Sequence, residues 1–155
     1  MTPNQCDIPS LKPVNILMAD DDAGDRKLAT KALSKHRLIN EIYTVKDGAE
    51  LLQYLKNEGE YADKNAYPFP DLLLLDLNMP KKNGLDALKE LRAHSELKEL
   101  PVVILTTSEA EEDICRSYEL GVNSYIVKPV TFQGLTNALL QMSDYWFALV
   151  TLPRR

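Results

Sequence analysis

The chain alternates short, almost entirely apolar runs with longer segments of helical periodicity, and this alternation limits its fold more than any other feature. Five such runs lie at residues 14–19, 41–45, 71–75, 102–105 and 124–127. Between them apolar residues recur three or four positions apart, as in Leu85, Leu88 and Leu91. Strands that alternate with helices predict a parallel sheet, because parallel neighbours need a crossover connection. We therefore expect an α/β fold, a doubly wound five-stranded parallel sheet flanked by five helices.

The overall charge argues against nucleic acid as a partner. The 155 residues carry a formal net charge of −5 with a pI near 5.1, whereas phosphate backbones are bound by basic faces.

Two cysteines, Cys6 and Cys115, are too few for a disulfide scaffold. The N-terminus lacks the pattern of a secretory signal, and no stretch reaches the roughly 18 apolar residues of a spanning helix. We expect a cytoplasmic protein that contacts neither membrane nor nucleic acid.

The same patterns divide the chain into one domain and two short ends. Residues 1–12 are expected to form a flexible N-terminus, residues 13–150 the domain, and residues 151–155 a C-terminal tail. The least regular stretch, residues 53–70, mixes charges with Gly59, Pro68 and Pro70, which predicts the end of a helix followed by a long exposed loop. Residues 131–150 predict a helix of about five turns, or a helix with an extended tail.

Acidic residues follow two of the predicted strands. Asp20, Asp21 and Asp22 come directly after the first run, and Asp76 closes the third. In an open parallel sheet, ligands bind beyond the carboxyl ends of the strands, where strand order reverses. If those two strands are neighbours, the carboxylates converge, and two of them about 5 Å apart repel by about 3 kcal/mol at an effective dielectric near 20. Such a cluster predicts a bound Mg²⁺, with Mn²⁺ as the alternative.

Each of these residues also has a plainer interpretation. The three consecutive aspartates form a good cap for the helix that starts near Asp25. Thr106, after the fourth run, is an ordinary strand residue, and Lys128, after the fifth, is an ordinary solvated charge. Their placement at the same edge as the aspartates favours a site instead, because a hydroxyl and an ammonium there can hold phosphoryl oxygens.

Four motifs resemble the signatures of bacterial response-regulator receivers. They are residues 18–22 (MADDD), 75–80 (LDLNMP), 105–108 (LTTS) and 125–129 (YIVKP). The resemblance extends from about residue 14 to residue 141. It implies a flavodoxin-like receiver fold with strand order 2-1-3-4-5. It also implies a response regulator of a two-component phosphorelay, a phosphoprotein that signals by switching conformation and is not a dedicated enzyme.

The resemblance assigns roles to individual residues. Asp76 is the phosphoacceptor, and it receives the phosphoryl group from a phosphohistidine of a histidine kinase. Asp20, Asp21 and Asp76 bind Mg²⁺ together with the backbone carbonyl of Asn78. Two further residues, Thr106 and Lys128, bind the phosphoryl oxygens, and Tyr125 reports the switch.

Three further segments resemble the small regulators paired with cyanobacterial phytochrome kinases. They are residues 59–62 (GEYA), residues 80–84 (PKKNG) and the ending that runs from 145–147 (YWF) to 152–153 (LP). This likeness implies a phytochrome-type kinase as partner, a homodimer, and an output through contacts with a downstream protein that the sequence does not name.

The C-terminal segment supports the homodimer on its own pattern. One apolar stripe with spacings of three and four is formed by Phe132, Leu135, Leu139, Met142, Trp146 and Leu149. A second apolar surface beside it predicts an interface that includes Tyr145, Trp146, Phe147 and Val150. The alternative is that the tail folds back over its own domain.

Two other functions compete with the receiver. A Mg²⁺-dependent small-molecule phosphatase of the haloacid-dehalogenase type also uses an aspartate nucleophile at a strand end. Such enzymes place a second aspartate two residues later, where this chain has Asn78. The second competing function is a structural adaptor with an unused site. The complete site set disfavours it: Asp20, Asp21, Asp76, Thr106 and Lys128.

Overall fold

The computed structural model describes residues 14–35 and 39–145 and shows the predicted parallel sheet. Five strands stand in the order β2-β1-β3-β4-β5: β1 (Val14–Ala19), β2 (Ile39–Val45), β3 (Leu72–Leu75), β4 (Val102–Thr106) and β5 (Ser124–Val127). Every neighbouring pair is parallel. The predicted flavodoxin-like fold with strand order 2-1-3-4-5 is therefore confirmed.

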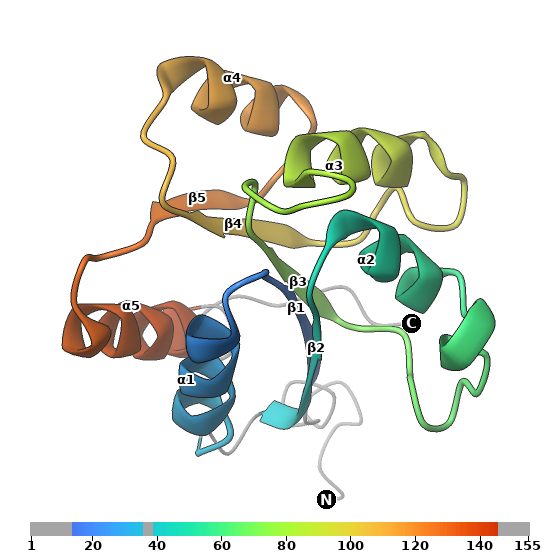
Figure 1. The fold of residues 1–155 in the computed structure, drawn as a ribbon, viewed down its shortest axis with the longest axis horizontal. Coiled ribbons are helices and arrows are strands. Elements are labelled where there is room, and N and C mark those ends of the chain that lie inside the picture. Colours follow the sequence, from blue (N-terminus) through green and yellow to red (C-terminus); the bar gives the residue numbers. More distant parts are fainter. Residues whose placement is uncertain (1–13, 36–38, 146–155) are drawn as a thin grey trace, which may run out of the picture.

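Helices cover both faces of the sheet (Figure 1). Their bounds are α1 (Ala23–Leu33), α2 (Gly48–Leu55), α3 (Gly84–Ala93), α4 (Glu111–Glu119) and α5 (Phe132–Asp144). The pair α1 and α5 lies on one face, and α2, α3 and α4 lie on the other. Within the described ranges, no helix combines the length and apolarity needed to cross a membrane.

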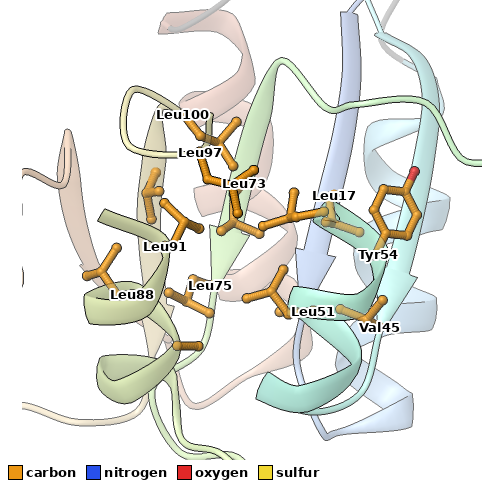
Figure 2. Close-up of a cluster of buried hydrophobic side chains, with 14 of the residues drawn as sticks. Leu17, Val45, Leu51, Tyr54, Leu73, Leu75, Leu88, Leu91, Leu97 and Leu100 are labelled. Atoms are coloured by element: carbon orange, nitrogen blue, oxygen red, sulfur yellow. The ribbon is translucent and has the colours of Figure 1, made fainter. Parts of the chain in front are cut away.

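The alternating direction of strand side chains divides the core into two layers. Leu17, Leu73 and Ile104 belong to the cluster under α2 and α3, part of which Figure 2 shows. Their chain neighbours, among them Ile16 and Leu72, belong to the cluster under α1 and α5. All four residues of β3 are at most 1% exposed, as expected for a central strand covered on both faces.

Four helices, α1, α2, α3 and α5, begin at polar caps that the sequence already carries. The side chains of Asp22, Asp47, Asn83 and Thr131 each accept a hydrogen bond from a backbone amide in the first turn of α1, α2, α3 and α5. A cap of this kind satisfies an amide that has no partner within the helix. The capping interpretation of the aspartate run is therefore correct for Asp22.

Two strands extend further than predicted. β2 begins at Ile39 rather than at residue 41, because its start pairs with Val14 across an irregularity in the register. β4 includes Thr106, which pairs with Val127 of β5. Both extensions depend on pairing with a neighbouring strand, and the apolar pattern along one strand carries no information about that pairing.

The expected exposed loop at residues 53–70 is in part an aromatic layer. After α2, a 3₁₀ turn η3 (Gly59–Tyr61) buries Tyr61, whose ring lies 5.3 Å from Tyr54 and 4.9 Å from Tyr67 between centroids. Tyr54 also donates a hydrogen bond to the Pro68 carbonyl at 3.0 Å. Tilted and edge-on ring contacts of this kind stabilise the segment against α2. The prediction of an exposed loop is correct for residues 58–60 and 62–66, on either side of the buried Tyr61.

The apolar stripe of α5 is confirmed at three positions and wrong at one. Leu135, Leu139 and Met142 are buried in the cluster shared with α1. Phe132 is 71% exposed, because it begins the helix beside the β5–α5 loop instead of facing the sheet. The expected ends at residues 1–12 and 151–155, and the predicted interface residues Trp146, Phe147 and Val150, lie outside the described residues.

Candidate functional site: an acidic cluster closed by a lysine

The register of the central strands brings Asp20 and Asp76 together. Ala19, the last residue of β1, pairs with Leu75, the last residue of β3, so the two aspartates leave neighbouring strands at the same level. Their backbones are still fixed by the sheet. The Asp76 amide donates a hydrogen bond to the Ala19 carbonyl at 2.9 Å, and the Asp20 amide donates one to the Val45 carbonyl at 3.1 Å.

Three carboxylates form one cluster at this edge. Asp20, Asp21 and Asp76 each contribute an oxygen, and these oxygens all lie within 4.8 Å of one another. Asp20 is fully buried and Asp76 is 5% exposed, whereas Asp21 faces solvent. The predicted convergence is confirmed. Since buried like charges repel strongly, the cluster needs a positive charge beside it.

Lys128 provides that charge. Its Nζ donates to Asp20 Oδ2 at 2.6 Å, to Asp25 Oδ2 at 2.8 Å and to Asp76 Oδ2 at 3.3 Å. Its backbone amide donates to the Thr106 carbonyl at 2.7 Å, which fixes the residue at the end of β5. The side chain is 5% exposed, so the interpretation of Lys128 as a solvated charge is wrong.

The lysine and the aspartates change each other's proton affinity. Burial acts to lower the pKa of Lys128, but hydrogen bonds to Asp20 and Asp25 and the charges of Asp20 and Asp76 raise it above its usual value. Burial also raises the pKa of Asp20 to about 6, against hydrogen bonds from Lys128 and Asp22 that favour the charged form. Desolvation is thus the larger influence on Asp20.

Sequence reasoning missed Asp25 as a member of the site. The sequence predicts Asp25 only as the start of a helix, and it does lie in the first turn of α1. Its position in the sequence indicates that it lies near the site, because the first turn of a helix that directly follows a strand stays close to the end of that strand. The cap formed by Asp22 aligns this turn, since its Oδ1 accepts from the Asp25 amide at 3.0 Å.

The residues assigned to the switch lie on the β4 side of the site. Thr106 is fully buried at the end of β4, and its Oγ1 accepts from the Ser108 amide at 3.4 Å. The half-buried Tyr125 of β5 donates its hydroxyl to the Ser108 carbonyl at 3.0 Å. Both side chains therefore contact the loop between β4 and α4.

The loop that follows Asp76 is fixed from two directions. The Asn78 amide donates to Asp76 Oδ1 at 3.2 Å, and the Asn78 side chain donates to the Thr107 hydroxyl at 3.4 Å. Behind this loop, a Cβ atom on Gly84 would lie 2.3 Å from the Asp76 carbonyl oxygen. Glycine is required there because any side chain would push α3 away from the backbone of Asp76.

The carboxylates fit a small divalent cation. Hard oxygen donors that converge on one point, one of them open to water, suit Mg²⁺ or Mn²⁺. Asp20 and Asp76 already accept hydrogen bonds from Lys128 and from backbone amides. A carboxylate offers about four lone-pair sites, so ligation is compatible with these bonds.

The fold and the site together define a flavodoxin-like α/β domain with a lysine-bridged acidic cluster at its carboxyl edge. The profile of the response regulator receiver domain matches residues 16–140. Response regulator Rcp1 of Synechocystis sp. is 38% identical over 141 residues, which cover 91% of this chain and 94% of Rcp1. The chain belongs to the response regulator receiver family.

Solved structures agree with this assignment. The phosphorylated cyanobacterial phytochrome response regulator RcpA superposes with a TM-score of 0.85 at 40% identity, covering 92% of this chain and 99% of RcpA. The Mn²⁺-bound form of Rcp1 gives a TM-score of 0.84 at 37% identity, with 92% and 100% coverage. A response regulator in red light signalling of R. palustris gives 0.81 at 30% identity, with 92% and 99% coverage.

The raised pKa of Asp20 predicts a distinct pH dependence of stability in the metal-free protein. Between about pH 4 and pH 6 the folded state keeps a proton on Asp20 that the unfolded state releases, so the contribution of Asp20 to stability falls as pH rises. Asp20→Asn removes this titration. The free energy of unfolding of Asp20→Asn minus that of wild type should therefore increase by up to about 3 kcal/mol as the pH is raised from 4 to 7.

Urea denaturation in the presence of EDTA at four pH values measures this difference. Asp22→Asn is the matched control, since Asp22 is exposed and asparagine caps helices equally well. A difference between wild type and Asp20→Asn that stays constant over this range would contradict the prediction.

Proposed function

We propose that this receiver is a phosphorylation switch in which Asp76 accepts a phosphoryl group from a phosphohistidine of a histidine kinase. The observation that carries the proposal is the position of Asp76, buried at the end of the central strand between two other carboxylates and an ammonium. An Asp76 oxygen attacks phosphorus, the phosphorus–nitrogen bond breaks, and the electron pair stays on the imidazole, which takes up a proton. The product is an aspartyl phosphate.

The neighbouring residues supply the electrostatics of this transfer. Asp20, Asp21 and Asp76, with the Asn78 carbonyl, would hold Mg²⁺, or Mn²⁺ in its place, and the cation would neutralise charge on the phosphoryl oxygens. The Lys128 ammonium donates to a phosphoryl oxygen, and the Thr106 hydroxyl donates to another. Tyr125 links the loop after Thr106 to β5, so a shift of that loop reaches the surface of α4 and β5.

A dedicated phosphatase is the weaker alternative. The residue two positions after Asp76 is Asn78, whose exposed amide contacts Thr107 and cannot act as a general acid or base. We therefore propose a phosphoacceptor with slow self-dephosphorylation, not an enzyme with a small-molecule substrate.

The partner that we propose is a phytochrome-type histidine kinase. The support is the likeness along nearly the full chain to RcpA, named as a cyanobacterial phytochrome response regulator. The output is a contact with a downstream protein, since the chemistry proposed for the site ends at the aspartyl phosphate.

We also propose a homodimer that includes Tyr145, Trp146, Phe147 and Val150. Its support is an apolar surface at the end of α5, where Tyr145 is 54% exposed and Leu140 is 37% exposed. Uncovered apolar area is unfavourable by about 25 cal/mol per Å², so an apolar surface of this kind favours association.

Phosphorylation is expected to depend on Asp76 alone. Intact mass of the wild type after treatment with acetyl phosphate and Mg²⁺ should show a gain of one phosphoryl group, and Asp76→Asn should show none, because the amide is not a nucleophile. Asp22→Asn, an exposed cap at the same edge, should gain the group as wild type does. A phosphorylated Asp76→Asn chain would refute the assignment.

Two neighbouring exposed aspartates are expected to differ in their effect on metal affinity. Asp21→Asn removes a carboxylate of the cluster and should weaken Mg²⁺ and Mn²⁺ binding by about tenfold or more. Asp22→Asn removes the same charge one residue away while keeping the helix cap, and should bind nearly as wild type does. Calorimetric titration measures both, and equal affinities for the two variants would count against the site.

The dimer is tested by removing the segment after Asp144. The full chain should sediment as a dimer at tens of micromolar, and the truncated chain as a monomer. Two monomers would refute the dimer. Two dimers would place its interface elsewhere in the chain.

A further inference from the structure

Asp25 is a third carboxylate on the Lys128 ammonium, and the metal site does not use it. Its Oδ2 accepts from Lys128 Nζ at 2.8 Å, closer than the 3.3 Å contact of Asp76. Its side chain is 17% exposed, so water screens the pair only partly. Asp25 is not part of the cluster whose oxygens lie within 4.8 Å of one another, which consists of Asp20, Asp21 and Asp76.

Asp25 affects the binding of a phosphoryl group because the Lys128 ammonium has a limited number of donors. A lysine ammonium has three N–H donors, and all three are engaged here by Asp20, Asp25 and Asp76. Lys128 can therefore bind a phosphoryl oxygen only if one of these bonds is released or shared.

The three carboxylates differ in what happens to them in the phosphorylated state. Asp20 shares its charge with a bound cation, and Asp76 carries the phosphoryl group itself. Asp25 has neither change, so it retains its full attraction for Lys128. It is also held in place, because its amide donates to the Asp22 cap in the first turn of α1.

We propose that Asp25 competes with the phosphoryl group for the Lys128 ammonium and so sets how strongly phosphorylation draws Lys128 into the site. Asp25 is a positioning residue that acts through Lys128, and this inference rests on the proposed role of Asp76. Arg26 strengthens the link between α1 and the site, since its guanidinium donates to the Asp20 carbonyl at 2.8 Å. The same competition therefore couples the start of α1 to the phosphorylation state.

Beryllofluoride, which mimics a phosphoryl group on aspartate, gives an equilibrium test. It is titrated in the presence of Mg²⁺ and followed by calorimetry. Asp25→Asn should bind it at least about threefold more tightly than wild type, the size of effect expected between directly bonded groups. The direction of the change is decisive, because structural damage in the first turn of α1 would weaken binding. Asp25→Ser serves if Asp25→Asn does not fold, and Asp25→Glu should return the affinity toward that of wild type.

Two controls separate competition for Lys128 from a general loss of negative charge. Asp22→Asn makes the same charge change three residues away, outside reach of Lys128 in this structure, and should change the affinity less than Asp25→Asn does. In a Lys128→Ala chain, titrated until it saturates, Asp25→Asn should have no further effect. An equal gain in that background means direct repulsion of the anion and overturns the proposal.

The outcomes also separate this inference from the proposed function. A wild-type chain that binds no beryllofluoride and gains no phosphoryl group on Asp76 refutes the phosphoacceptor. A wild-type chain that does both, together with an Asp25→Asn variant of equal or weaker affinity, refutes the role of Asp25 alone.

Discussion

The repulsion among carboxylates at one edge of the sheet is the constraint on which the rest of the site depends. Asp20 and Asp76 are almost fully buried and lie beside Asp21, so the edge is stable only with a cation among them. In the structure this cation is the Lys128 ammonium. A bound Mg²⁺ would add positive charge beside two of the same carboxylates, Asp20 and Asp76. Ion binding and the position of Lys128 are therefore two aspects of one charge balance.

The remainder of the fold keeps this edge in register. β1 and β3 pair residue for residue up to Ala19 and Leu75, and apolar side chains of both strands fill the core on either face. Gly84 allows α3 to approach the backbone of Asp76. Because the interior is close-packed, a displacement at any of these contacts would move a carboxylate.

The same geometry explains how a small chemical change at Asp76 could act at a distance. Lys128 connects the end of β5 with β1, β3 and α1 through three ion pairs, and its amide connects β5 with Thr106. Tyr125 connects β5 with the loop after β4. The ends of β1 and β3, the start of α1, and β4 therefore contact either this lysine or its strand, and a new anion at Asp76 would redistribute those contacts together.

The sequence by itself determined the strand–helix alternation, the parallel sheet and the carboxylates at strand ends, because these follow from local periodicity and from residue type. The family motifs then supplied the strand order. Tertiary structure alone decided that Lys128 is buried, that Asp25 bonds it, and that Tyr54, Tyr61 and Tyr67 pack together in a stretch that looks like a loop. These contacts join residues from different elements, and their energies depend on distances that no pattern along the chain encodes.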